Sequence, residues 1–290
     1  MSTQGIAEIV TLPSQDLELA WTAIHVDQAV KDRLLAQALL SLTVRRRIPF
    51  ETAPLHGLIL LSGPPGTGKT TLARGLANQI ANALPKNKVT FAQIDPHAFA
   101  SSALGKSQKE VTKLFQNTIP EIAMDGVCVI LFDEVETLIA DRHQLSLETN
   151  PVDVHRATDA ALAGLDMLTR QHKNAILIAT TNFPQALDEA LLSRADIVEH
   201  IGRPNKAARA KIIKDMLIAM AQQWKDLETL AGESEIFAEL TEGLDGRQLR
   251  KAILSAAAQN KASAMDLNKL TKQQLVDSFK QIQCLKPKEG

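Results

Sequence analysis

The sequence is poor in cysteine, and its charges nearly cancel. Among its 290 residues there are two cysteines, Cys128 inside an apolar run and Cys284 near the tail. This pattern fits two reduced thiols better than a disulfide framework. The 32 basic and 33 acidic residues leave a formal net charge of -1, so the composition gives no sign of a nucleic-acid-binding surface.

Long apolar segments are missing as well. No run approaches the roughly 18 residues that a bilayer span requires. The first ten residues, MSTQGIAEIV, lack the charged start and apolar core of a signal peptide. We find no internal repeat and no low-complexity tract. We therefore expect a soluble, cytoplasmic protein with no membrane partner, folded as one large domain or two smaller ones.

The most informative segment that is present is a glycine-rich loop. It matches G-x-x-x-x-G-K-[ST] at every fixed position, follows the apolar run 58–61 and precedes a helical pattern. A strand that enters a glycine turn before a helix directs backbone N–H groups at a phosphate. The predicted nucleotide-binding residues are Gly63, Pro64, Pro65, Gly66, Thr67, Gly68, Lys69, Thr70 and Thr71.

A second segment supplies the acids that such a loop needs. The apolar run 127–132 ends in Asp133 and Glu134. We predict that Lys69 reaches the outer phosphates of ATP and that the Thr70 hydroxyl coordinates Mg²⁺. Asp133 would complete the Mg²⁺ shell, and Glu134 would polarise the attacking water.

Three further residues are candidates for catalysis. Asn182 follows the apolar run 175–179, where an amide would hold the water or the γ-phosphate, although asparagine is equally typical of a turn there. Arg247 opens a helix and is placed to contact the phosphates of its own subunit. Arg194 is a candidate arginine finger for a neighbouring subunit, and the alternative is a surface salt bridge with Asp196.

The order of apolar patterns predicts an α/β fold. Strands alternate with helices, which predicts a doubly wound parallel sheet of five strands with ligands at the carboxyl ends of the strands. We expect a large ATP-binding domain with an N-terminal helical extension at 1–204. A small all-helical lid domain is expected at 205–290. The predicted strands are 58–61, 88–95, 127–132, 175–179 and 196–201.

Three local features have more than one interpretation. Residues 24–26 would form a wall of an adenine pocket or pack in the core. The arginine triplet 45–47 is typical of a solvated helix face, with a phosphate or partner contact as the lesser alternative. The helical pattern 111–122 contains Pro120, which must bend or end the helix.

Taken in order, these motifs resemble those of an AAA+ ATPase across essentially the whole chain. The likeness narrows further to the pachytene-checkpoint ATPases, also called thyroid-receptor-interacting AAA+ proteins. The segments that carry this closer resemblance are Leu12-Pro-Ser with Trp21 and Asp27, Asp133-Glu-Val-Glu-Thr-Leu138, Ser193-Arg-Ala-Asp-Ile197 with Ile201-Gly202, and Leu244-Asp-Gly-Arg-Gln-Leu-Arg-Lys251.

The resemblance implies a hexameric ring that remodels HORMA-domain proteins and unlatches a closed conformer. It also implies the individual roles given above for seven residues: Lys69, Thr70, Asp133, Glu134, Asn182, Arg194 and Arg247. The family's eukaryotic members carry an N-terminal substrate-docking domain, whereas almost nothing precedes Leu12 here. That resembles the short bacterial members, which lie beside HORMA proteins and nucleotide-synthesising enzymes in antiphage defence operons.

The pore loop departs from the family pattern. Where the family has an aromatic residue followed by an apolar one, this chain has Ala103, Leu104 and Gly105. Grip on a substrate would then come from Leu104, or from Phe99 if the register of the loop slips.

Three functions are compatible with these motifs. The first is an ATP-driven protein remodeller, and the second is a scaffold whose assembly is set by bound nucleotide. The third is a clamp-loader-like ATPase acting on DNA. Intact Glu134 and Arg194 argue against the scaffold, and the balanced charge argues against the DNA-associated enzyme.

Overall fold

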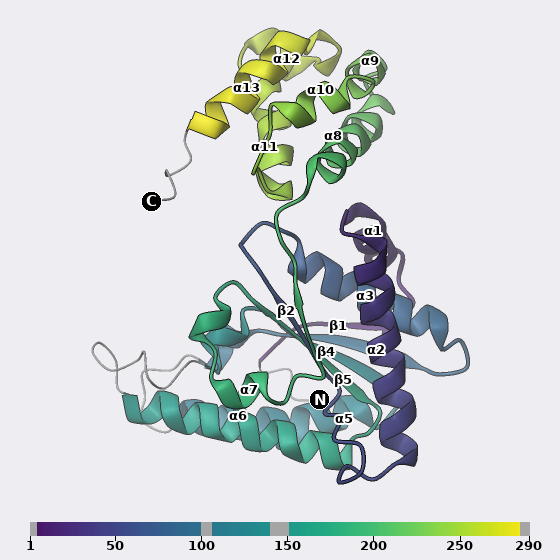
Figure 1. Ribbon diagram of the computed structural model, residues 1–290, viewed down its shortest axis with the longest axis vertical. Coiled ribbons are helices and arrows are strands. Elements are labelled where there is room, and N and C mark those ends of the chain that lie inside the picture. The colour runs from purple at the N-terminus through teal and green to yellow at the C-terminus, as the bar shows by residue number, and fades with distance from the viewer. Residues whose placement is uncertain (1–4, 100–105, 140–150, 285–290) are drawn as a thin grey trace. The chain divides into compact units, whose positions relative to one another are not determined.

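The computed structural model describes residues 5–99, 106–139 and 151–284 (Figure 1). Contacts between Cα atoms divide the chain into two compact units. We call them the sheet unit, residues 1–63 and 69–201, and the helical unit, residues 64–68 and 202–290. The described helices are too short or too polar to cross a bilayer.

The described strands form one six-stranded sheet in the order β1-β3-β4-β5-β2-β6. Strands β2 to β6 are parallel to one another, which confirms the predicted doubly wound α/β fold. The strands are β1 (Ile6–Leu12), β2 (Leu58–Ser62), β3 (Val89–Ile94), β4 (Val127–Phe132), β5 (Ala175–Thr181) and β6 (Ile197–His200).

The predicted strand count of five was wrong, because β1 joins the sheet as an antiparallel neighbour of β3. Its period-two pattern is hard to see in the sequence. Glu8 occupies a half-buried position, where Arg74 contacts its carboxylate, while Ile9 points outward and is 41% exposed. A sheet edge tolerates both, because one of its two sides has no neighbouring strand.

Helices cover both faces of the sheet (Figure 1). The apolar core is divided by the sheet, as alternate residues of β4 show: Ile130 belongs to one cluster, and Val129 and Leu131 to the other. All six residues of β4 are buried, as expected of a central parallel strand. The helices of the sheet unit are α1 (Gln15–Ala23), α2 (Gln28–Arg47), α3 (Lys69–Ala83), α4 (Lys106–Lys113), α5 (Ile119–Ala123), α6 (Pro151–Gln171) and α7 (Glu189–Leu192).

Pro120 changes the helix type instead of ending the helix. Helix α4 continues through a π-helical turn, Leu114–Thr118, into α5, where Pro120 lies in the first turn. Proline has no N–H to donate to the preceding turn, and a wider π turn is a known way to absorb such a break.

Residues 24 and 26 pack against the core next to α1–α3, so the core-packing interpretation of this segment fits the structure.

The prediction of a solvated arginine triplet was wrong for Arg45, which is 4% exposed. Helix α2 extends to Arg47 and places Arg45 on the same face as its buried residues Ala38 and Leu42. The Arg45 guanidinium donates to the carbonyl of Ala175 at 2.6 Å and to those of Thr169 and His172 at 3.2 and 3.3 Å. The last carbonyls of a helix such as α6 lack helical partners, and Arg45 supplies donors for them.

The helical unit has its own apolar core, and its described residues contain no strand. The predicted stripes are present, because Ile212, Ile213, Leu249 and Ile253 are all buried. Its helices are α8 (Lys206–Ala221), α9 (Leu227–Ala231), α10 (Ser234–Glu239), α11 (Gly246–Ala257), α12 (Lys261–Met265) and α13 (Lys272–Cys284).

Candidate active site

The glycine-rich loop leaves β2 at Ser62 and enters α3 at Lys69. Gly63, Gly66 and Gly68 have φ angles of +140°, +80° and +92°, which favour glycine. A Cβ atom on Gly63 would lie 2.2 Å from the carbonyl oxygen of Ile201. A residue with a side chain would therefore force the loop away from the sheet, so glycine is required at the start of the loop.

The Lys69 ammonium is held between the loop and the end of β5. Its Nζ donates to the Gly63 carbonyl at 2.7 Å and to Asn182 Oδ1 at 2.8 Å. Lys69 is buried, with 6% of its surface exposed. An ammonium group makes its strongest hydrogen bonds to anionic oxygens, which suits contact with a phosphate.

Asp133 and Thr70 place two oxygen atoms together beyond the end of β4. The Thr70 hydroxyl donates to Asp133 Oδ1 at 2.8 Å. These are hard oxygen ligands, and Mg²⁺ in nucleotide sites takes few protein ligands because waters and phosphates supply the rest. The described residues contain no cluster of three acids, histidines or cysteines that could hold a metal alone.

Thr180 is a site residue to which the sequence analysis gave no role. Its hydroxyl donates to Asp133 Oδ1 and accepts the backbone N–H of Glu134 at 3.1 Å. Strands β4 and β5 are parallel neighbours with Phe132 opposite Ala179, so Asp133 must fall beside Thr180. The sequence predicted both strand ends at the carboxyl edge of a parallel sheet, but not that β4 and β5 are neighbours in it.

Glu134 has a strained backbone. Its φ and ψ are 51° and 54°, and among the described residues it is the one non-glycine residue with a positive φ. Such conformations cost of order 1–3 kcal/mol and concentrate at functional sites. The turn leaves the side chain exposed, with Oε1 at 3.3 Å from Asn182 Nδ2. Asn182 therefore bridges Lys69 and Glu134.

Glu136 is a second residue that received no role from the sequence. Its Oε1 accepts the backbone N–H of Asn182 at 3.1 Å. Its Oε2 is buried and has no hydrogen-bond partner among the described residues. Glu136 thus fixes the backbone of the residue that joins Lys69 to Glu134. In the motif Asp-Glu-Val-Glu, Val135 is buried in the core. Burial of Val135 anchors the segment that carries Glu136 next to the acids at the end of β4.

The predicted alternative partner of Arg194 was wrong. Arg194 does not pair with Asp196 but with Asp166 of α6, through two hydrogen bonds of 2.8 Å from Nε and NH2. The hydrogen bonds from Arg194 lower the pKa of the Asp166 carboxyl. The Asp196 carboxylate instead accepts the backbone N–H groups of His56 and Gly57 at 2.7 and 2.8 Å.

Arg247 lies in the helical unit, in the first turn of α11, and is exposed. Asp245 caps this helix. Its side chain accepts the backbone N–H of Gln248 at 2.8 Å, and the Gln248 side chain accepts the backbone N–H of Asp245 at 3.0 Å. A cation in the first turn opposes the helix dipole, at a cost of about 0.3–1 kcal/mol. Helix stability therefore does not account for an arginine at this position.

The pore-loop residues Ala103, Leu104 and Gly105 lie outside the described residues. Phe99, the alternative gripping residue, is described. It is 5% exposed and belongs to the core of the sheet unit. A side chain in that environment is not accessible to a substrate, so the alternative involving Phe99 was wrong.

Comparison with known proteins gives consistent relatives. The model of the ATPase family associated with various cellular activities (AAA) matches residues 59–203. CD-NTase-associated protein 6 of Pseudomonas aeruginosa is 44% identical over 289 residues, covering 99% of this chain and 95% of that protein. The pachytene checkpoint protein 2 homolog of Danio rerio is 30% identical over 288 residues, covering 90% of this chain and 68% of that protein.

A solved structure shares the fold. It is that of the E. coli MS115-1 HORMA:CdnC:Trip13 complex, matched with a TM-score of 0.76 at 19% identity over 96% of each chain. The match to the AAA family model and the identity to relatives along nearly the whole sequence lead to one assignment. This chain belongs to the AAA family of ATPases and, within it, to the family of the pachytene checkpoint protein 2 homologues.

Proposed function

We propose that this protein binds ATP with Mg²⁺ and hydrolyses it, releasing the γ-phosphate. The observation that carries the proposal is the chain of side-chain contacts from Lys69 through Asn182 to Glu134, with bonds of 2.8 and 3.3 Å. It joins a phosphate-binding cation to a carboxylate that is exposed and held in a strained turn. A site that only stores nucleotide has no need of that carboxylate.

Each residue of this chain has a separate task. Lys69 binds the outer phosphates, and Thr70 and Asp133 would hold the Mg²⁺ ion, which neutralises charge on the phosphates when bound. The Asn182 amide orients the attacking water together with Glu134. The Glu134 carboxylate accepts the proton of that water as its oxygen bonds to the γ-phosphorus and the bond from that phosphorus to the leaving ADP oxygen breaks. Thr180 and Glu136 hold this arrangement through the bonds described above.

The two arginines are assigned to different subunits. We propose a homo-oligomeric ring, expected to be a hexamer, in which Arg194 contacts the nucleotide of the neighbouring subunit. Its ion pair with Asp166 would open to allow this contact. Arg247 is proposed to contact the phosphates of its own subunit. Residues 1–204 would then act as the ATP-binding domain and residues 205–290 as a lid.

We propose a HORMA-domain protein as the substrate. The support is the likeness to CD-NTase-associated protein 6 and to a chain of the HORMA:CdnC:Trip13 complex. ATP hydrolysis would unlatch or disassemble HORMA-containing complexes and so regulate antiphage signalling in the cytoplasm.

Glu134→Gln tests the enzyme. The variant keeps the shape of the side chain but removes the base, so we expect ATP turnover to fall by about 10²–10⁴-fold with ATP affinity within a few-fold of wild type. Glu121→Gln, an exposed acid in α5, is the matched control. Equal turnover in the Glu134 variant and in the control would contradict the proposed base.

A purified HORMA-domain protein bound to its partner in the closed conformer tests the substrate. Size-exclusion chromatography of its closed complex, with ATP and wild-type protein, should show release of the bound partner, and the Glu134→Gln variant should remain bound without release. A protein that hydrolyses ATP but leaves the complex intact would contradict the substrate and leave the ATPase assignment in place.

Arg194 can be tested in trans. Mixed rings of Arg194→Ala and Lys69→Ala subunits should recover part of the turnover that each variant lacks alone, because an intact site forms where Arg194 of one subunit meets Lys69 of the other. No recovery at any ratio, in rings shown to be mixed, would contradict the finger.

A further inference from the structure

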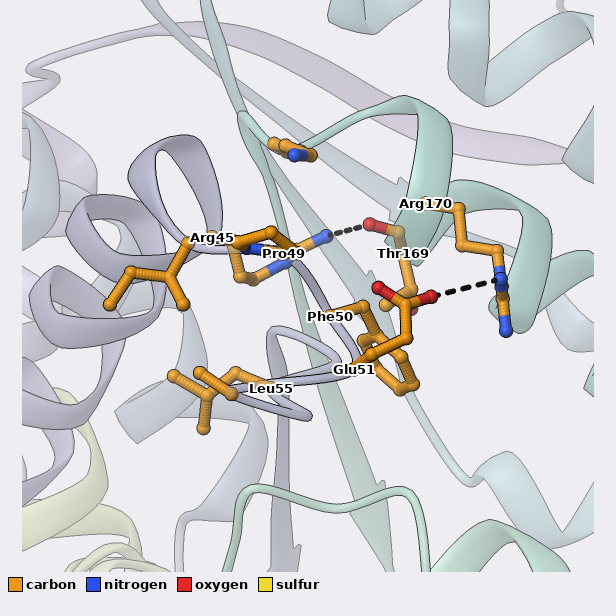
Figure 2. Close-up of a pocket in the computed structure, with 10 residues that line it drawn as sticks. Arg45, Pro49, Phe50, Glu51, Leu55, Thr169 and Arg170 are labelled. Carbon is orange, nitrogen blue, oxygen red and sulfur yellow. Dashed lines mark hydrogen bonds and ion pairs between the residues drawn. The ribbon is translucent and has the colours of Figure 1, made fainter.

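A pocket of about 230 Å³ lies in the sheet unit, away from the candidate active site. It is formed by the C-terminal end of α2, the loop 48–55 and the last turn of α6 with Lys173 (Figure 2). We call it the basal pocket. The loop that forms it leads into β2 at Leu58, whereas the phosphate-binding loop follows the same strand at Ser62. The two sites are therefore at opposite ends of β2.

The back of the pocket contains a hydrogen-bond donor without an acceptor. Arg45 crosses from α2 toward Thr169 (Figure 2), and its terminal nitrogens donate to the carbonyl oxygens of Thr169 in α6 and Ala175 in β5. Its Nε is buried and has no hydrogen-bond partner among the described residues. Buried donors are nearly always paired in folded proteins. The guanidinium therefore places a buried positive charge at the back of the pocket.

The charge around the pocket favours an anionic acceptor. Of the charged residues that line it, Arg45, Arg170 and Lys173 are basic and Glu51 is acidic. Glu51 lies 3.7 Å from Arg170, with both side chains more than 60% exposed, at 72% and 62%. An exposed ion pair of this length is weak, so Arg170 can exchange Glu51 for another carboxylate.

The floor of the pocket is apolar. The Arg170 guanidinium lies over the Phe50 ring, with 5.4 Å between Cζ of Arg170 and the ring centroid. Pro49 and Leu55 also contribute to the lining. Ile48 lines the pocket as well and is 38% exposed, which is high for an isoleucine. An occupant would therefore carry an apolar group next to its negative charge.

The volume limits the size of the occupant. Sites for drug-sized ligands and cofactors measure about 300–1,000 Å³, and the basal pocket, at about 230 Å³, is smaller. A nucleotide would not fit within it. One or two side chains of a peptide would fit, since such a segment buries only its side chains and leaves its backbone at the surface.

We propose that the basal pocket binds a segment of a partner protein in which an aspartate or glutamate stands beside an apolar residue. The carboxylate would contact Arg170 and Lys173, next to the buried positive charge of Arg45. The apolar side chain would lie on Phe50 and Ile48. Because the site is at the other end of β2 from the phosphate-binding loop, it would hold a partner during ATP turnover without blocking the nucleotide.

Methyl NMR can test this directly. The protein is labelled at isoleucine δ1 methyls, and Ile48 is assigned with an Ile48→Val variant. Titration with acetyl-Leu-Asp-Leu-amide should shift the Ile48 signal and leave Ile9, an exposed isoleucine of β1, unchanged. Acetyl-Leu-Asn-Leu-amide should bind about tenfold more weakly, because hydrogen bonds to a charged acceptor are the stronger ones.

Charge reversal provides the matched comparison. Lys173→Glu should weaken binding of the aspartate peptide about threefold or more, whereas Lys86→Glu, at another exposed lysine of the sheet unit, should not. Thermal melting checks that both variants fold. Three results would overturn the proposal: no shift at Ile48 with either peptide, equal affinity for the two peptides, or equal weakening by the two reversals.

Discussion

The two ends of the parallel strands use buried charge in different ways. At the carboxyl ends, Lys69 donates to the Asn182 side chain as well as to the Gly63 carbonyl. Asp133 accepts from the hydroxyls of Thr70 and Thr180. At the amino ends, Arg45 and Asp196 bond largely to backbone carbonyls and N–H groups. A side chain that completes backbone hydrogen bonds stabilises the fold, whereas side chains bonded to one another remain able to exchange partners for a ligand.

Backbone strain also differs between the two ends of the strands. Glu134, at the carboxyl end of β4, adopts a left-handed backbone conformation, and Glu136 beside it has a buried oxygen with no partner among the described residues. Burying an unpaired polar atom costs about 1–3 kcal/mol. An unpaired buried atom is also present near the amino ends, at Arg45 Nε, so the left-handed backbone of Glu134 is the feature that distinguishes the carboxyl ends.

The largest expected effect is on stability and belongs to the amino ends. Arg45→Met should lower the free energy of unfolding by about 3 kcal/mol, because it leaves two or three carbonyls of α6 and β5 without their donor, at about 1–3 kcal/mol each. Urea denaturation measures the loss. Arg46→Met, at an exposed neighbour in the same helix turn, is the control. A loss below about 1 kcal/mol would remove the contrast between the two ends.

Lys69→Ala should produce the opposite profile. The phosphates lose a charged donor worth about 1.5–3 kcal/mol, so ATP should bind roughly ten- to a hundredfold more weakly. The free energy of unfolding should change by less than about 1 kcal/mol, because removing a buried cation also removes its desolvation cost. Calorimetric titration and urea denaturation, with Lys86→Ala as the control, separate the two effects. A strongly destabilised protein would contradict the comparison.

Glu136 sharpens the comparison within the active site. Glu136→Ala removes the acceptor for the Asn182 N–H, worth about 1 kcal/mol, so kcat should fall about fivefold with ATP affinity retained. Glu136→Gln keeps an acceptor oxygen of the same shape and should restore most of the rate. Loss of stability without a change in kcat would show a purely structural role for Glu136.

The smallest effect concerns the pair of Arg194 and Asp166. Arg194 lowers the pKa of Asp166 in the folded protein. Its stabilising contribution is therefore present above the unfolded pKa of about 3.9 and is lost as the pH falls through the folded pKa. The Asp166 side chain is 42% exposed, so Asp166→Asn should cost less than about 1 kcal/mol at pH 7.

That difference between wild type and Asp166→Asn should disappear in acid, where the wild-type carboxyl is also neutral. Denaturation curves at several pH values measure it. A gap that stays constant below pH 3.9 would show that the pair contributes through packing and not through charge.

The sequence by itself determined the parallel sheet, the phosphate-binding loop and the acids at the end of β4. These features depend on short-range patterns. A buried strand reads as a continuous apolar run, and the loop is contiguous, so its glycines, Lys69 and Thr70 are fixed by one segment. The position of Thr180 beside Asp133 required the strand order, which places β4 next to β5.

Only the tertiary structure decided which group each charged side chain contacts. Arg194 and Asp166 are separated by 28 residues, Asn182 and Glu136 by 46, and Arg45 and Ala175 by 130. Local periodicity places each of these residues on a helix or at a strand end, but it does not say which helix end faces which arginine. That choice depends on how the helices pack on the two faces of the sheet, where the summed burial of apolar side chains outweighs any single ion pair.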